Sequence, residues 1–152
     1  MSRTPHGVDP VLRTRARRRA MQALYAWQMA GGEARTIIAQ FAHEQAREAA
    51  DLIYFEDLVR GVIEHQSSID AALNKFLDRD VEQVDGVERA VLRLATYELR
   101  HRIDVPYRVV LNEAIETVKR FGAEHGHTYV NGVLDQAALE WRSVESKSGK
   151  AP

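Results

Sequence analysis

The sequence predicts an all-α protein of about seven helices, and two observations support this fold class. Strict alternation of apolar and polar residues, which is typical of half-buried strands, is scarce along the 152 residues. Apolar residues recur instead at intervals of three and four, as they do on one face of a helix. From this spacing we expect helices joined by short links, and no sheet.

The apolar stripes give the order of the expected helices. The first stripe runs over residues 20–27 and stops at Gly31–Gly32, since glycine commonly ends a helix. A weaker stripe follows at residues 37–42 and a stronger one at residues 52–62. The last stripe runs over residues 129–141.

Two of the expected helices begin with a pattern that resembles a capping box. Ser67 is followed by Asp70, and Asp85 is followed by Glu88, each pair beside an apolar stripe. Pro106 interrupts the chain between two further stripes and is expected to begin the next helix, where proline is tolerated.

The chain length favours a single domain, which we place at residues 1–142 with a basic N-terminal arm. Residues 143–152 read as a polar, flexible tail. The helical pattern weakens around residues 78–86, which suggests a joint between an N-terminal and a C-terminal helical half.

Composition excludes several classes of protein. The chain has no cysteine, which rules out disulfides and thiolate chemistry, and it has no Gly-rich cofactor loop after a strand. We therefore expect no enzyme activity and no cofactor. No secretory signal and no apolar run of the roughly 20 residues needed to cross a bilayer are visible, so we expect a cytoplasmic protein without a membrane partner.

Charge is distributed unevenly along the chain. The formal net charge is −1, but residues 1–30 hold six Arg and one Asp, a balance of +5. The remaining residues hold 15 basic and 21 acidic side chains, a balance of −6. Such a basic head on an acidic body suggests that a polyanion binds at one end and a basic partner elsewhere.

Five arginines fall within the seven residues "RTRARRR": Arg13, Arg15, Arg17, Arg18 and Arg19. On a helical wheel they spread around most of the circumference, so we expect this turn to overhang the body or to form a flexible arm. A solvated helix start is the plain alternative. The guanidinium of arginine suits phosphate and can stack on bases. A DNA reader would need a recognition helix with polar residues, but the candidate helices look committed to core packing, so single-stranded RNA fits better than DNA.

Five blocks of the sequence, in family order, resemble the NusB family of transcription antitermination factors. The blocks are "RRRAMQALYAWQ", "YFEDLVRGV", "ERAVLRLATYEL", "DVPYRVVLNEAIETVKRFG" and "YVNGVLD". The resemblance implies two small three-helix bundles packed together. It also implies binding to boxA, a single-stranded element of ribosomal RNA leader transcripts, together with the ribosomal protein NusE. The pair would recruit further Nus factors to RNA polymerase.

The resemblance also implies which residues contact RNA. The family's arginine motif falls on Arg13, Arg15 and Arg17. Thr14 stands where a relative can have a further arginine, so some phosphate contacts would pass to Arg18 or Arg19.

Three further positions carry over from the family. Tyr129 matches the aromatic residue that stacks on a base, Glu88 matches an acidic position near the RNA, and His125 stands where relatives can carry Asp. Each has a plain alternative: the ring of Tyr129 as core, Glu88 as a capping residue, and His125 with His127 as a metal pair. Two loop histidines without a third ligand nearby rarely bind a metal.

Two other functions compete with antitermination. Domains of this type also occur fused to RNA cytosine methyltransferases, but this chain lacks a catalytic cysteine. The second alternative is a helical adaptor whose arginines touch an acidic protein. Comparing binding to boxA RNA with binding to a scrambled strand separates this adaptor from an antitermination factor.

Overall fold

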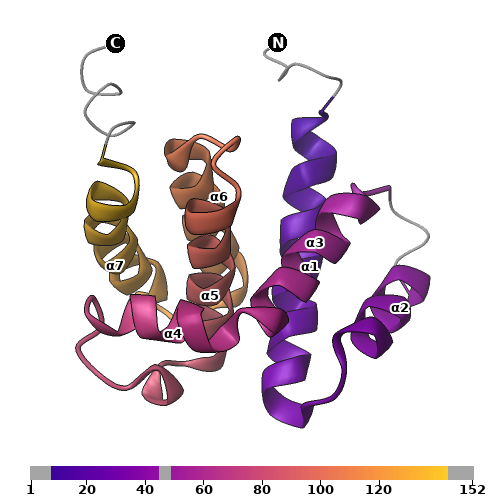
Figure 1. The fold of residues 1–152 in the computed structure, drawn as a ribbon, viewed down its shortest axis with the longest axis horizontal. Coiled ribbons are helices and arrows are strands. Elements are labelled where there is room, and N and C mark those ends of the chain that lie inside the picture. Colours follow the sequence, from indigo (N-terminus) through magenta and orange to yellow (C-terminus); the bar gives the residue numbers. More distant parts are fainter. Residues whose placement is uncertain (1–7, 45–48, 144–152) are drawn as a thin grey trace. The chain divides into compact units, whose positions relative to one another are not determined.

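The computed structural model of the protein describes residues 8–44 and 49–143 (Figure 1). These residues form seven α-helices and one short 3-10 helix, and they contain no strand. The prediction of an all-α fold with about seven helices is therefore confirmed. Of the predicted tail, only Ser143 lies within the described residues. No helix in this part of the chain combines the length and the apolar character needed to cross a membrane.

The chain divides into two compact units, Met1–Glu64 and His65–Pro152. The joint expected at residues 78–86 is therefore misplaced. That segment links two helices within the second unit and includes the 3-10 helix η2 (Val81–Gln83). Its weak helical pattern reflects a loop, not a boundary between units.

The first unit is a bundle of the helices α1 (Pro10–Ala30), α2 (Ala34–Glu44) and α3 (Leu52–Glu64). Helix α1 packs against both others. It starts where the Asp9 carboxylate accepts a hydrogen bond from the N–H of Val11 at 2.9 Å, and it ends at Gly31 with a φ of 75°. The core of the unit is built from fully buried side chains on α1 and α3, among them Ala20, Leu24, Leu58 and Val62.

The second unit contains α4 (Gln66–Asn74), α5 (Gly86–His101), α6 (Tyr107–Phe121) and α7 (Gly126–Trp141). Helices α5, α6 and α7 each pack against the other two, and α4 packs on α5. Every residue of α5 from Glu88 to Leu99 is buried, so α5 is the central helix of the second unit. Its first turn lines the pocket described below.

Of the two expected capping boxes, the first is absent and the second forms only through its Asp85 half. Helix α4 follows His65 and has no side-chain cap, and Asp70 accepts hydrogen bonds from Nε and Nη2 of Arg93, both at 2.9 Å. Arg93 is only 2% exposed, and a buried guanidinium needs a carboxylate close by. Asp85 does cap α5, because its carboxylate accepts the N–H of Val87 at 3.2 Å.

Candidate nucleic-acid interface

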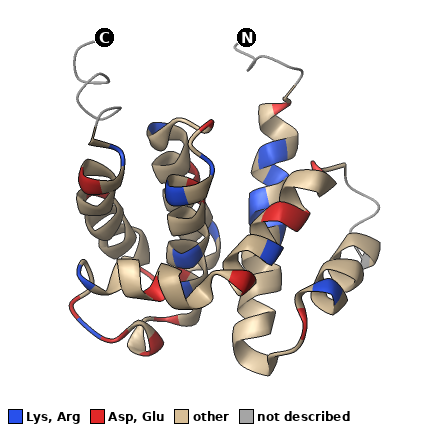
Figure 2. Cartoon of the chain, viewed as in Figure 1, with Lys and Arg blue, Asp and Glu red and all other residues tan. Residues whose placement is uncertain are grey.

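The five arginines of residues 13–19, which we call the basic turn of α1, lie in the first half of that helix, where Figure 2 shows successive basic bands. Nε of Arg13 donates to Oδ2 of Asp51 at 3.1 Å. The Arg13 guanidinium also lies 3.8 Å from the centroid of the Tyr54 ring, and that of Arg17 lies 5.4 Å from the same centroid. Both contacts are within the range of cation–π attraction.

Asp51 connects these arginines to the start of α3. Its carboxylate accepts the N–H of Tyr54 at 3.0 Å, and its own N–H donates to the carbonyl of Leu12 at 3.2 Å. Nearby, Nη1 of Arg15 donates to the carbonyl of Ala49 at 3.0 Å. Hydrogen bonds thus connect the basic turn of α1 to the segment that leads into α3.

The expectation of an overhanging or flexible arginine arm is wrong for the described residues. Arg17 and Arg19 are 5% and 6% exposed, and Arg13 is half-buried. Residues 13 and 17 are four apart and share one helix face, where their stems and flat guanidinium groups pack on the Tyr54 ring. Arg18 differs from them: it is half-buried and has no ion pair or side-chain hydrogen bond among the described residues.

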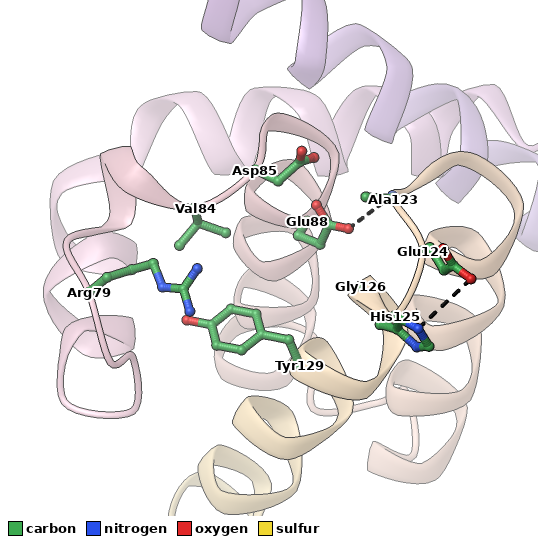
Figure 3. A pocket seen from close by; sticks show the side chains of 9 residues that line it. All are labelled: Arg79, Val84, Asp85, Glu88, Ala123, Glu124, His125, Gly126 and Tyr129. Carbon is green, nitrogen blue, oxygen red and sulfur yellow. Dashed lines mark hydrogen bonds and ion pairs between the residues drawn. The ribbon is translucent and has the colours of Figure 1, made fainter.

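The second unit contains a pocket of about 210 Å³ (Figure 3). It lies between the α4–α5 link, the first turn of α5 and the segment that joins α6 to α7. Its lining residues are Arg79, Val84, Asp85, Glu88, Ala123, Glu124, His125, Gly126 and Tyr129. Three residues predicted from sequence, Glu88, His125 and Tyr129, therefore line one pocket, whereas the predicted arginines belong to the other unit.

Glu88 is a buried acid in the pocket wall. Oε2 accepts the N–H of Ala123 at 3.2 Å, while Oε1 has no hydrogen-bond partner among the described residues. Burial, followed by the neighbouring Asp85, raises the pKa of Glu88 to about 7. The pKa of Asp85 is lowered, chiefly by a hydrogen bond with the Glu88 side chain. The two acids can therefore share one proton near neutral pH.

Two glycines allow the Glu88 carboxylate to reach the α6–α7 segment. A Cβ at Gly126 would overlap this carboxylate, and a Cβ at Gly122 would lie 2.9 Å from Oε2. The expected capping role of Glu88 is thus replaced by a contact across the bundle. The glycine of "HGH" is required by this close approach, which sequence spacing does not reveal.

Tyr129 is half-buried, and its hydroxyl donates to Oδ1 of Asp78 at 3.2 Å. The guanidinium of Arg79 lies 4.8 Å from the centroid of the Tyr129 ring. Neither Asp78 nor Arg79 was predicted as a site residue. Their only signal is the charged run "DRD" in the segment where the helical pattern weakens.

His125 is exposed and precedes α7 with a left-handed backbone (φ 68°). Its Nε2 lies 3.8 Å from Oε2 of Glu124. His127 belongs to the first turn of α7, and no three potential metal ligands gather anywhere in residues 8–44 and 49–143. The structure therefore places His125 at the rim of the pocket, beside acidic groups.

The sequence matches the model of the NusB family over residues 14–139. It is 72% identical to the transcription antitermination protein NusB of Stenotrophomonas maltophilia (strain K279a) over 140 residues, 92% of this chain and 88% of that protein. It is 70% identical to the protein of the same name from Xanthomonas campestris pv. campestris (strain B100) over 145 residues, 95% of this chain and 91% of that one.

Solved structures show the same likeness. The NusB of T. maritima aligns with a TM-score of 0.75 at 33% identity, covering 91% of this chain and 94% of that chain. A chain from the crystal structure of antitermination factors NusB and NusE in complex with dsRNA aligns with a TM-score of 0.77 at 27% identity, covering 84% and 96%. With the family match extending over nearly all of the described helices, the chain belongs to the NusB family.

Proposed function

We propose that this protein is a transcription antitermination factor that binds single-stranded boxA RNA of ribosomal RNA leader transcripts together with NusE. In this proposal the pair recruits further Nus factors to RNA polymerase. The observation that carries the RNA-binding part is the half-buried Tyr129 ring at a pocket of about 210 Å³. That volume is below the roughly 300–1,000 Å³ of drug-sized sites and suits one flat group such as a nucleobase.

Single-stranded RNA is the form that this pocket favours. An aromatic side chain can stack only on a base whose face is free, and in a duplex the faces are occupied by neighbouring base pairs. The related NusB–NusE complex was solved with double-stranded RNA, so a duplex is the natural competitor in any test.

The arginines of α1 supply phosphate contacts in this proposal. Arg13, Arg15 and Arg17 keep the role expected from the sequence, although each of them also contacts another segment of the first unit. Arg18 has no competing partner among the described residues, which favours it for the contact that Thr14 cannot make. Arg19 is buried and is the weakest of the five as a direct ligand.

NusE is expected to bind the acidic body of the protein. Residues outside 1–30 carry a balance of −6, which complements a basic ribosomal protein. If NusE extends the RNA-binding surface, it raises RNA affinity, and RNA then raises NusE affinity by the same factor.

The test is a set of equilibrium titrations of the full chain with labelled boxA RNA, a scrambled strand and a boxA duplex, each with and without NusE. Tight binding to single-stranded boxA, strengthened by NusE, is the expected result. Equal affinity for the scrambled strand would remove the sequence-specific role, and preference for the duplex would remove the single-strand role. Deleting residues 1–19 is not a usable variant, because it removes buried parts of α1 such as Ala16 and Arg17.

A further inference from the structure

Among the described residues, Arg79 is the one arginine or lysine that lines the pocket, and it stands among acidic groups. The other ionisable side chains of the wall, apart from the phenol of Tyr129, are Asp85, Glu88, Glu124 and His125. An RNA strand that brings a base to Tyr129 also brings its phosphates close to these carboxyl groups. A fixed cation at this place would offset that repulsion.

The position of Arg79 is fixed by two neighbours. Its Nε and Nη2 donate to the two carboxylate oxygens of Asp78 at 2.7 and 3.0 Å, and its guanidinium lies over the Tyr129 ring. The same carboxylate accepts the Tyr129 hydroxyl. Asp78 therefore holds the cation and the aromatic ring in one arrangement, and Figure 3 shows the Arg79 side chain reaching toward the ring across the pocket.

Arg79 keeps donors to spare. A guanidinium has five N–H groups, and Asp78 accepts one from Nε and one from Nη2. The two hydrogens of Nη1 and the second of Nη2 have no acceptor within the described part of the chain. A phosphate oxygen can accept from these groups while the contact with Asp78 persists.

A surface ion pair between sequence neighbours is the plain alternative. Exposed pairs of this kind contribute little to stability, and holding an arginine still costs side-chain entropy. The additional contacts with the ring and the hydroxyl of Tyr129 are not explained by such a pair. They are explained if the cation is placed beside the ring for a ligand that engages both.

We propose that Arg79 is a further RNA-binding residue, which binds a backbone phosphate next to the base that stacks on Tyr129, and that Asp78 positions it. This inference rests on the proposed function, because it needs a base at Tyr129. The guanidinium covers one face of the ring, so the base takes the opposite face.

The test compares Arg79→Gln with Arg120→Gln in salt titrations of RNA binding. Arg120 is a matched control: it is an exposed arginine of the same unit, it lies 5.4 Å from the ring centroid of its neighbour Phe121, and it does not line the pocket. Loss of one phosphate contact lowers the slope of log affinity against log salt by about 0.7 for a single strand. Arg79→Gln should therefore bind about fivefold more weakly at 0.1 M salt, while Arg120→Gln keeps the slope of the unchanged protein.

Two further measurements keep the outcomes distinct. Arg79→Lys keeps the charge and should restore most of the slope, whereas a purely structural role for Arg79 predicts no change of slope in either variant. An unchanged slope and affinity in Arg79→Gln overturns the inference while leaving the proposed function intact. If the unchanged protein fails to prefer boxA but Arg79→Gln still lowers the slope on a scrambled strand, the proposed function fails and the phosphate contact stands. Absence of any salt-dependent RNA binding overturns both.

Discussion

The basic turn of α1 and the pocket beside Tyr129 use charge in opposite ways. In α1, the arginines are numerous and mostly engaged by the protein itself, as Arg13 is by Asp51 and Tyr54. In the pocket, a single arginine faces several acids, one of which, Glu88, is buried with an unpartnered oxygen. Density of charge along the sequence therefore does not measure how much of it is available to a ligand.

The same difference separates stability from binding. Removing an arginine of α1 that packs on α3 is expected to weaken both the first unit and the proposed RNA contact. Removing a side chain at the pocket rim is expected to change RNA affinity with little effect on folding, because such side chains are half-buried or exposed. Variants of the two regions should consequently show opposite balances of affinity and stability.

The largest effect is expected at Tyr129. Replacement by Ala removes the stacking ring and should cost about 1–3 kcal/mol of RNA affinity, as for other base–aromatic stacks. Tyr129→Phe keeps the ring, loses only the hydrogen bond to Asp78, and should bind within a factor of a few of the unchanged protein. Fluorescence anisotropy with boxA RNA measures both. An alanine variant that melts early yet binds RNA normally while folded would assign the ring to the core.

The next effect tests the region around α1 by stability. Arg13→Ala loses the ion pair with Asp51 and the packing on Tyr54, and should lower the free energy of unfolding by about 2 kcal/mol. Arg18→Ala has no comparable contact to lose and should change it by less than about 0.5 kcal/mol. Urea unfolding of the two variants gives the comparison, and equal losses would mean that the contacts of Arg13 add nothing to stability.

Local patterns predicted the helices, because the signals that start and end them lie within a few residues. Asp85 caps α5 and Gly31 ends α1, as their neighbours in the sequence indicated. The ion pair of Arg13 could not be predicted, since its partner Asp51 is 38 residues away in the sequence. The contact between Tyr129 and Asp78 spans 51 residues, so no local spacing brings Arg79 into the site.

The three pocket residues taken from the family resemblance show the same limit. The resemblance placed Glu88, His125 and Tyr129 in one functional class, and the structure places them around one pocket. It did not indicate that Glu88 is buried or that Gly126 touches it, because both facts depend on how the α6–α7 segment crosses the start of α5. Their contacts with RNA remain predictions.

The smallest expected effect concerns the pH dependence that Glu88 gives to the second unit. Its pKa is about 7 in the folded chain, against an ordinary value of 4.5. Between these values the folded chain keeps a proton that the unfolded chain releases, so this contribution to stability is complete below pH 4.5 and is lost as the pH rises through 7. Glu88→Gln keeps the side chain neutral, and its amide oxygen can still accept the N–H of Ala123.

Above pH 7 the Glu88→Gln variant should therefore be more stable than the unchanged protein by about 1 kcal/mol, less than the full shift implies because the pocket admits water. Urea unfolding at pH 5.5 and pH 8 measures the difference, which should fall to about half at the lower pH, because the folded and unfolded chains differ in protonation from pH 4.5 upward. Glu124→Gln is the matched control, since this carboxyl lies in the same pocket but its side chain is 89% exposed. A Glu88→Gln variant that lost stability between pH 5.5 and 8 as steeply as the unchanged protein would show that another group titrates.

RNA affinity should depend on the same proton, because a polyanion binds more tightly to a pocket with one fewer negative charge. The RNA affinity of the unchanged protein should therefore fall as the pH rises through 7, whereas that of Glu88→Gln should not.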